Sequence, residues 1–449
     1  MPIDVKIKKG LKLNLKGEAK NSIEQAQKSK TVALRPSNFH SLVPKLVLKE
    51  GAKIKAGDEV FFSKYSDKTR VVSPVSGVLK EIKRGAKRKI LEVIIEADDY
   101  IEYKDFGSMN PLESESSLVK ERIFSTGLGI FLNQRPYNIP ADADDTPKAI
   151  YISAYDTAPL SASHELVLKD KAEYFQNGIN ALTKLTGGKV YLGVDKQSAT
   201  FLKDVQNVEL ITISGPHPAG NVGTLIHETE PMNRGERVWT INPEDVAIIG
   251  EQFKTGKYNA ERTVVVTGSA AHENNRKYFK TIIGSEVKSF LTDFEDNSRI
   301  ISGNVLTGEK IESDGYINFF SNTLTVIPEG NEYRMFGWVP FKDNDIHSAS
   351  KTSLSWLFPN KKYDVNTNLN GEERALVVTG EMEEMMPMDI LPMQLLKACM
   401  AGDIEKMENL GIYEVVPEDF ALVEYTNTSK IEAQEIIRNG LDLMITEVG

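Results

Sequence analysis

Three short apolar segments between residues 148 and 213 constrain the fold of this chain more than any other feature. They occupy 148–154, 189–194 and 208–213, and each has the composition of a strand buried within a sheet. A helix is predicted at 165–185, where apolar residues recur at helical spacing; they are Leu166, Ala172, Phe175, Ile179 and Leu182. A strand–helix–strand order is typical of a parallel sheet covered by helices. We therefore expect a Rossmann-like α/β domain over residues 118–260.

The first hundred residues are rich in short strand-like segments separated by turn residues. These segments lie at 32–34, 45–48, 59–62, 70–72, 78–79 and 91–95. Residues 48–60, followed by 73–79, resemble the biotinyl/lipoyl barrel-sandwich fold, in which glycines supply the tight turns. We expect a barrel-sandwich hybrid (lipoyl-like) domain over residues 1–100.

Asp67-Lys68 raises the question of a lipoyl or biotinyl carrier, because carriers of this fold present their modified lysine in an Asp-Lys hairpin. Here the hairpin is about two residues short, and Thr69 stands where a smaller residue is usual. A plain, unmodified turn is the commoner explanation, and an intact-mass measurement would distinguish it from a carrier.

The middle of the chain continues the mixed pattern. Residues 101–117 are polar, which indicates a linker. Residues 261–315 combine a strand, a helix-like segment at 280–291 and a second strand at 299–308. This order fits a small β-grasp (soluble-ligand-binding) module. Residues 316–370 form a β-rich connecting segment that includes Phe336-Gly337-Trp338, an aromatic stretch suited to an interface or, more commonly, to a core.

The tail, residues 371–449, is predicted to be helical. Asp389 can cap a first helix that has Pro392 in its first turn. A second helix is expected from Asp403 to Leu410 and ends at Gly411, and a third spans 430–444. The predicted fold class is therefore α/β and multidomain, α+β overall.

Cysteine content and charge exclude several functions. The single cysteine rules out an internal disulfide, a Cys₄ zinc site and a cysteine-ligated iron–sulfur cluster. The net charge is −10, but residues 1–55 hold 13 Lys/Arg against 4 Asp/Glu, and residues 371–449 hold 5 against 17. A nucleic-acid-binding protein would be basic overall. The basic end suits an anionic membrane surface, an acidic partner or plain solvent exposure.

No targeting or nucleotide-binding motif is complete. No run approaches the roughly 18 apolar residues of a membrane span, and the N-terminus lacks the apolar core of a signal peptide, so a cytoplasmic protein is expected. Gly127-Leu128-Gly129 lacks the third glycine of a dinucleotide loop, because position 132 is Leu132. His164-Glu165 and His272-Glu273 do not fit a zinc-protease helix, and neither a phosphate loop nor a nucleophile elbow is present.

A rigid loop follows the strand at 208–213. It contains Pro216, His217 and Pro218 between two glycines, and loops after strands of α/β sheets commonly carry ligand or partner sites. A structural corner explains the same residues equally well, and the sequence leaves the two readings open.

Four methionines open the tail, at Met382, Met385, Met386 and Met388. Thioethers can bind copper(I), but methionines far more often fill irregular cores. When the bacterial cluster motif C-x₂-C-x₂-C-x₃-C-P is anchored on Met386-Pro387, the other ligand positions hold no cysteine. The segment therefore cannot ligate a cluster, and the core is the favoured role of its methionines.

Several strings of residues together resemble one family. They are Gly10-Leu11, Arg84-Gly85-Ala86-Lys87-Arg88, Arg135-Pro136, Thr157-Ala158-Pro159-Leu160, Gly215-Pro216-His217-Pro218-Ala219-Gly220, Ile301-Ser302-Gly303-Asn304-Val305-Leu306-Thr307-Gly308, Phe336-Gly337-Trp338 and Met386-Pro387-Met388-Asp389. From end to end they resemble the A subunits of the sodium-translocating NADH:quinone oxidoreductases. The domain order is also similar to the C subunit of the Rnf complex and to the NADH-binding subunit of complex I, whose glycine-rich loop and iron–sulfur cysteines are missing here.

The resemblance implies a peripheral subunit of a translocase that oxidises NADH, reduces quinone and exports Na⁺. The subunit would lie at the cytoplasmic face of the bacterial inner membrane, without a transmembrane segment. It would bind no cofactor of its own, while flavins and 2Fe-2S centres belong to partner subunits and quinone is the substrate. Its partners would be the B, C, D, E and F membrane subunits, chiefly the B subunit, and no nucleic acid. The tail would be ferredoxin-like, with its cluster lost.

The resemblance also indicates which residues would lie near quinone. A quinone needs an apolar or aromatic wall and donors for two carbonyl oxygens. Phe39 and Tyr137 would supply the wall, and His40, Gln134 and Arg135 would donate. The alternative is a structural role for these side chains, in a scaffold that docks on the B subunit without contacting quinone.

Overall fold

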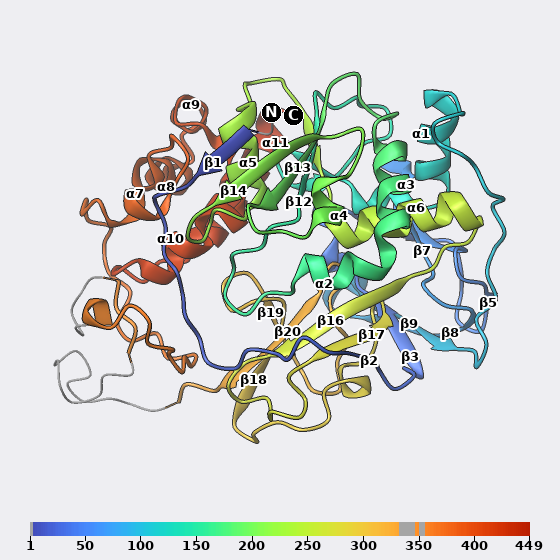
Figure 1. Cartoon of the computed structure of the whole chain (residues 1–449), viewed down its shortest axis with the longest axis horizontal. Coiled ribbons are helices and arrows are strands. Elements are labelled where there is room, and N and C mark those ends of the chain that lie inside the picture. The colour runs from blue at the N-terminus through green and yellow to red at the C-terminus, as the bar shows by residue number, and fades with distance from the viewer. Residues whose placement is uncertain (1–2, 332–345, 350–354) are drawn as a thin grey trace.

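The structure is a computed structural model, and it describes residues 3–331, 346–349 and 355–449. The described strands form four sheets, and a bundle of helices closes the chain. Figure 1 shows the helical tail in red at the upper left, beside the largest sheet, with the other sheets below and to the right. The aromatic stretch Phe336-Gly337-Trp338 lies outside the described residues.

The largest sheet has seven strands in the order β1-β14-β13-β12-β15-β10-β11. Their bounds are β1 Ile3–Lys6, β10 Asn133–Arg135, β11 Ile139–Pro140, β12 Ile150–Ser153, β13 Val190–Asp195, β14 Glu209–Ser214 and β15 Val238–Thr240. β12, β13 and β14 are parallel neighbours, so the predicted strand–helix–strand unit is confirmed. The N-terminal strand β1 adds to the edge of this sheet, parallel to β14.

Helices cover both faces of the seven-stranded sheet. The helix predicted at 165–185 is present as α2 (His164–Leu168) and α3 (Ala172–Leu182), joined by a 3₁₀ turn. α3 packs on α6 (Pro243–Thr255) on one face, and α5 (Val222–Thr229) and the tail lie on the other (Figure 1). α3 and α6 approach so closely that a Cβ at Gly250 would lie 1.8 Å from the carbonyl oxygen of Tyr174. Only glycine permits that crossing.

The barrel-sandwich prediction is also confirmed. One sheet has the order β3-β9-β8-β5 and the other β4-β6-β7. Their bounds are β3 Thr31–Leu34, β4 Pro44–Leu46, β5 Lys53–Ile54, β6 Glu59–Ser63, β7 Ser66–Val72, β8 Gly77–Arg84 and β9 Ile90–Ala97. The expected turn at Asp67-Lys68 is wrong, because the chain turns three residues earlier, at Lys64-Tyr65. Lys68 lies within β7, where its Nζ pairs with Asp144 at 2.5 Å.

The remaining sheet has six strands in the order β19-β18-β20-β16-β17-β2. Its strands are β2 Ile23–Gln25, β16 Glu261–Thr267, β17 Tyr278–Ile282, β18 Ser298–Ser302, β19 Glu309–Ile311 and β20 Thr323–Pro328. The helix expected at 280–291 is wrong: β17 occupies its start, and only a 3₁₀ turn, Val287–Ser289, follows. β-branched residues favour the strand, and Gly284 ends it with a φ of +74°.

The tail contains α7 (Glu381–Met385), α8 (Pro392–Ala401), α9 (Ile404–Asn409), α10 (Ala421–Thr426) and α11 (Ala433–Glu447). The helix expected from Asp403 to Leu410 is present as α9: Asp403 caps it by accepting the N–H of Lys406, and Gly411 follows its end in the left-handed region. The expected cap at Asp389 is wrong, because Leu391 holds the N-cap position directly before Pro392. The Asp389 N–H donates to His227 Nε2 instead.

The methionine segment belongs to the core of the tail. Met382, Met385, Met386 and Met388 are each at most 8% exposed and pack in one apolar cluster with Met407. Their predicted role as core residues is confirmed. Among the described residues, no group of histidine, cysteine and carboxylate side chains is placed to hold a metal. Within the same residues, no helix combines the length and hydrophobicity that crossing a bilayer requires.

Candidate functional site

A buried ion pair joins the largest sheet to the helical tail. Arg135, at the end of β10, places its Nη1 3.0 Å from Oδ2 of Asp419, and the two residues are 1% and 3% exposed. The same oxygen of Asp419 accepts the N–H of Val416. A Cβ at Gly223, in the first turn of α5, would lie 2.4 Å from the other oxygen of Asp419. The guanidinium of Arg135 is therefore committed to holding three elements together.

Tyr137 occupies the turn between β10 and β11, next to this pair. Its φ is +84°, a region that tyrosine rarely adopts, and Asn138 follows at +52°. The carbonyl oxygen of Tyr137 accepts a hydrogen bond from Arg438 Nη1 of α11 at 2.7 Å. Its ring meets the ring of Tyr413 edge-on, with centroids 6.4 Å apart. The turn is thus held in a strained form by the tail.

His40 joins the same network from the barrel-sandwich side. Its Nε2 lies 2.7 Å from Oδ1 of Asp442, which also accepts from Arg438 Nε at 3.0 Å. The chain His40–Asp442–Arg438–Tyr137 therefore links three parts of the molecule through side chains and one backbone oxygen. Phe39 lies outside this hydrogen-bond network. It is 3% exposed, and its ring packs against Phe319 and Phe320 in the core.

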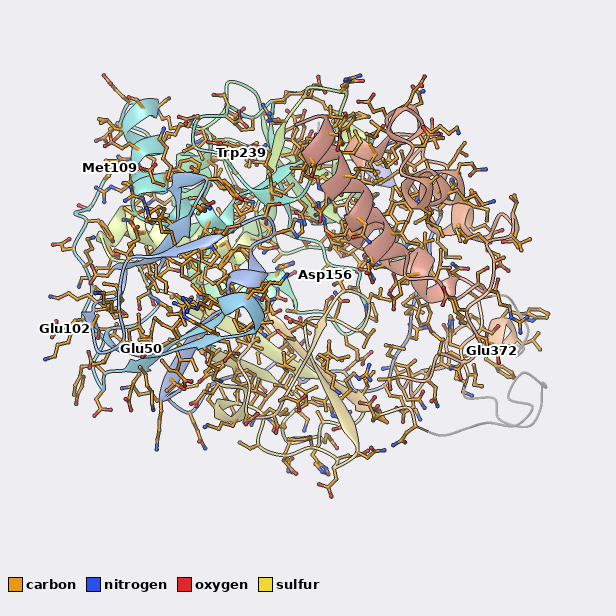
Figure 2. All side chains as sticks on the ribbon, turned by 180° about the vertical axis from the view of Figure 1, so that it is seen from behind. Glu50, Glu102, Met109, Asp156, Trp239 and Glu372 are labelled. Atoms are coloured by element: carbon orange, nitrogen blue, oxygen red, sulfur yellow. The ribbon has the colours of Figure 1, made fainter. Side chains whose placement is uncertain are left out.

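A small cavity, the hairpin cavity, opens beside the β10–β11 turn, with a volume of about 230 Å³. Its lining residues are Thr69, Gln134, Tyr137, Ile139, Pro140, Asp142, Asp145, Arg237, Ile445 and Gly449. Gln134 is 5% exposed, and its Oε1 accepts from the indole N–H of Trp239, which is fully buried (Figure 2). Arg237 Nε pairs with Asp145 at 3.2 Å. The cavity thus combines one aromatic wall with amide, guanidinium and carboxylate groups.

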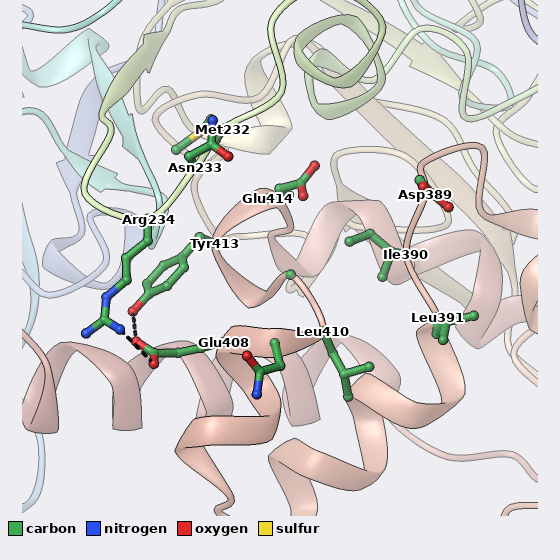
Figure 3. A pocket seen from close by; sticks show the side chains of 12 residues that line it. Met232, Asn233, Arg234, Asp389, Ile390, Leu391, Glu408, Leu410, Tyr413 and Glu414 are labelled. Atoms are coloured by element: carbon green, nitrogen blue, oxygen red, sulfur yellow. Dashed lines mark hydrogen bonds and ion pairs between the residues drawn. The ribbon is translucent and has the colours of Figure 1, made fainter.

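A larger cavity, the tail cavity, lies on the other side of the Tyr137–Tyr413 ring pair, and its volume is about 600 Å³. It is lined by Met232, Asn233, Arg234, Asp389, Ile390, Leu391, Glu408, Asn409, Leu410, Gly411, Tyr413 and Glu414. Figure 3 shows Arg234 and Tyr413 converging on Glu408. Arg234 Nη1 lies 3.1 Å from Glu408 Oε2, and the Tyr413 hydroxyl donates to Oε1 at 2.6 Å. The hydrogen bond to Glu414 raises the pKa of His227 beside this cavity.

The loop with Pro216, His217 and Pro218 makes internal contacts. The His217 side chain is 5% exposed, its Nδ1 lies 3.1 Å from Oγ1 of Thr157, and burial lowers its pKa to about 4. Its carbonyl oxygen accepts the N–H of Leu11 at 2.8 Å. These contacts are those of a corner that ties the N-terminal segment to the sheet. A ligand or partner role for the loop stays a prediction.

The structure therefore brings Gln134 and Tyr137 to one cavity and links His40 to Tyr137 through α11, but it separates Phe39 and Arg135 from them. Sequence reasoning missed Arg237 and Ile445, which line the cavity from distant parts of the chain. It also missed Asp156, labelled in Figure 2, which follows β12. A carboxylate three residues after the end of a buried parallel strand, as at Asp156, was the available signal.

Comparison with known families gives three matches along the chain. A model described as the NqrA N-terminal barrel-sandwich hybrid domain matches residues 5–98. One described as the NqrA second alpha/beta domain matches residues 114–258, and one described as the NQRA C-terminal domain matches 263–313.

Curated relatives match over nearly the whole chain. The A subunit of the Na⁺-translocating NADH-quinone reductase from Marinomonas sp. (strain MWYL1) is 35% identical over 98% of this chain and 99% of its own. The protein of the same name from Neisseria meningitidis serogroup B is 34% identical over 99% of this chain and 100% of its own. Among solved structures, an NAD⁺-reducing NiFe hydrogenase aligns with a TM-score of 0.38 and 10% identity, over 74% of this chain and 62% of that one.

Proposed function

The chain belongs to the family of the A subunits of the Na⁺-translocating NADH-quinone reductases, and from this membership we propose that it performs the role of that subunit. It would lie at the cytoplasmic face of the membrane, where partner subunits oxidise NADH and quinone is reduced as Na⁺ is exported. The observation that carries the proposal is the end-to-end match, because relatives with that name align over 98–99% of the chain.

The hairpin cavity is the place that we propose for contact with quinone. Tyr137 would form the aromatic wall, and the amide nitrogen of Gln134 is available as a donor because its oxygen is bound to Trp239. A volume of about 230 Å³ is below the ~300–1,000 Å³ usual for small-molecule sites. The cavity therefore suits a quinone ring, with any isoprenoid chain left outside.

The strained turn supports this assignment. Residues in sparsely populated backbone conformations gather at functional sites, where surrounding contacts hold them. Here Arg438 holds the Tyr137 carbonyl, and Asp442 orients Arg438. His40, bound to the same carboxylate, would act through this network rather than by touching the quinone. Phe39 and Arg135 would have structural roles.

We propose that the chain carries no flavin or iron–sulfur centre, so that electrons reach quinone from partner subunits. Cys399 is the single thiol of the sequence, and burial raises its pKa to about 12, which opposes thiolate ligation. The partners would be the B, C, D, E and F subunits, chiefly the membrane-embedded B subunit, and the flavins and 2Fe-2S centres would lie among them.

The finer domain assignments also rest on the family to which the chain belongs. We propose that β1 and β10–β15 form a Rossmann-like unit and that the six-stranded sheet is a β-grasp module whose helix is reduced to a 3₁₀ turn. The tail would be a ferredoxin-like domain that has lost its cluster. Methionines packed among Ile412 and Leu395 support the last point, because they fill the space that a cluster would need.

A scaffold that docks on the B subunit without touching quinone is the second candidate, and the internal placement of Phe39 and Arg135 favours it. Co-purification with the membrane subunits tests membership of the complex, and it fails if the chain never joins them. Quinone reduction by the complex with Tyr137→Leu then separates the two candidates. The matched control is Tyr100→Leu, which changes a tyrosine that is 90% exposed.

A further inference from the structure

Three consecutive large apolar side chains are exposed on a turn near the tail. Trp356, Leu357 and Phe358 are 54%, 50% and 52% exposed. Single exposed apolar residues are ordinary on protein surfaces, but a contiguous group on one turn is not.

The turn that presents these side chains is held firmly from beneath. Ser355 is buried, and its hydroxyl bonds to both the N–H and the carbonyl oxygen of Ser348. Tyr363, 4% exposed, packs its ring on His347 with centroids 5.1 Å apart. The backbone between them is closed by the N–H of Phe358, which donates to the carbonyl oxygen of Ser355 at 3.0 Å. The apolar side chains are thus displayed by an ordered base.

The basic N-terminal segment runs directly beside this turn, as the dark-blue and orange segments at the left of Figure 1 show. The amide of Asn14 donates to the carbonyl oxygen of Pro359 at 2.9 Å, and backbone hydrogen bonds join Asn14 and Lys16 to Tyr363. Residues 6–16 contain five lysines and no acidic residue.

Two chain-distant segments therefore bring cations to the edge of the apolar turn. Lys12 and Lys16 are exposed, and the turn contributes Lys361 and Lys362. The acidic residues among them are Glu18, which pairs with Lys362 at 2.7 Å, and Asp364. Among the described residues of these two segments, 12–18 and 355–364, four lysines stand against two carboxylates, on a chain whose net charge is −10.

We propose that this surface, Trp356-Leu357-Phe358 with Lys12, Lys16, Lys361 and Lys362, docks on the headgroup region of an anionic lipid bilayer. Tryptophan favours the membrane–water interface, and lysines near an anionic surface each strengthen binding roughly fivefold. The inference adds a lipid-contacting surface to the peripheral placement proposed above. It rests on that proposed function only for its biological setting.

Vesicle binding by the purified full chain tests the proposal. We expect the chain to sediment with phosphatidylcholine vesicles that contain phosphatidylglycerol, and much less with phosphatidylcholine alone. The triple variant W356S/L357S/F358S should bind at least about tenfold more weakly, and Y100S/L112S, which changes residues 90% and 52% exposed elsewhere, should bind normally. K12E/K16E should weaken binding by at least about tenfold, while K87E/K89E in the β8–β9 hairpin should not.

A fluorescence measurement that leaves the turn unchanged avoids the risk that a variant misfolds. In the Trp338→Phe chain two tryptophans remain, Trp239 and Trp356. Because Trp239 is fully buried, quenching of fluorescence by brominated lipids reports Trp356. Quenching supports the proposal. Absence of vesicle binding, equal binding by the triple variant, or loss of complex assembly in a variant that still binds vesicles would overturn it. If the chain does not bind vesicles but co-purifies with membrane subunits, the proposed function still holds.

Discussion

The hairpin cavity and the tail cavity differ in ways that make size a poor guide to function. The tail cavity is larger, about 600 Å³ against about 230 Å³, and each cavity contains an arginine that is already paired, Arg234 with Glu408 and Arg237 with Asp145. The hairpin cavity is smaller and is bordered by a turn whose Tyr137 has a positive φ. Each is lined by one ring of the Tyr137–Tyr413 pair. The strained backbone at Tyr137 is therefore the difference on which we propose the hairpin cavity as the quinone site.

The largest expected effect concerns the ion pair on which the hairpin cavity depends. Arg135→Met leaves Asp419 buried without its partner, which costs about 3–5 kcal/mol of unfolding free energy. Urea unfolding of the full chain measures it. The double variant R135M/D419L removes both charges and should recover most of the loss, because a buried pair replaced by apolar residues is often near neutral. If the double variant is no more stable than the single one, the pair is not what holds the hairpin to the tail.

Tyr137→Leu should separate the two cavities functionally. It removes the aromatic wall and the hydroxyl of the hairpin cavity, and we expect the apparent KM of the assembled complex for quinone to rise roughly tenfold, or about 1.4 kcal/mol. The control is Arg234→Ala in the tail cavity, which should leave the KM unchanged. The reverse pattern would move the quinone site to the tail cavity.

A pH effect should belong to the tail cavity alone. The hydrogen bond with Glu414 raises the pKa of His227 above its usual value of about 6.5. The stabilisation is therefore complete below about pH 6.5 and is lost as the pH rises through the raised pKa of the folded state. Thermal unfolding of His227→Gln between pH 6 and 9 should show a shallower decline than the unchanged chain. Equal slopes would mean that the pair carries no charge-dependent stability.

The smallest effect is expected at Arg234. Its side chain is 69% exposed, and exposed ion pairs contribute about 0.2–1 kcal/mol. Arg234→Ala should therefore shift the unfolding midpoint only slightly, and less at high salt. A loss comparable to that of Arg135→Met would show that the rim of the tail cavity is as rigid as the hairpin.

The periodic parts of the sequence predicted the fold well. The strands at 148–154, 189–194 and 208–213 alternate between two faces in the structure: Ile150 and Ile152 pack toward α3, and Tyr151 packs toward α5. Local pattern was insufficient where pairing is distant. β1 pairs with β14 and β2 with β17, about 200 residues or more away in each case. Nothing in residues 3–25 specifies those partners.

The candidate site was predicted in part, for a similar reason. Gln134 and Tyr137 lie in one short string, so a resemblance could indicate both. Arg237 and Ile445 reach the same cavity only through the fold. The commitment of Arg135 to Asp419, 284 residues away, likewise appears only once the tail is packed on the sheet. The resemblance had suggested a quinone donor at Arg135.

The most direct test of the account is to map where a photoreactive quinone attaches in the intact complex. After illumination and digestion, mass spectrometry should find the label on the peptide that contains Gln134 and Tyr137, with excess unmodified quinone suppressing it. Label on residues 389–414 of the tail cavity, or on partner subunits only, would contradict the assignment of the hairpin cavity as the quinone site.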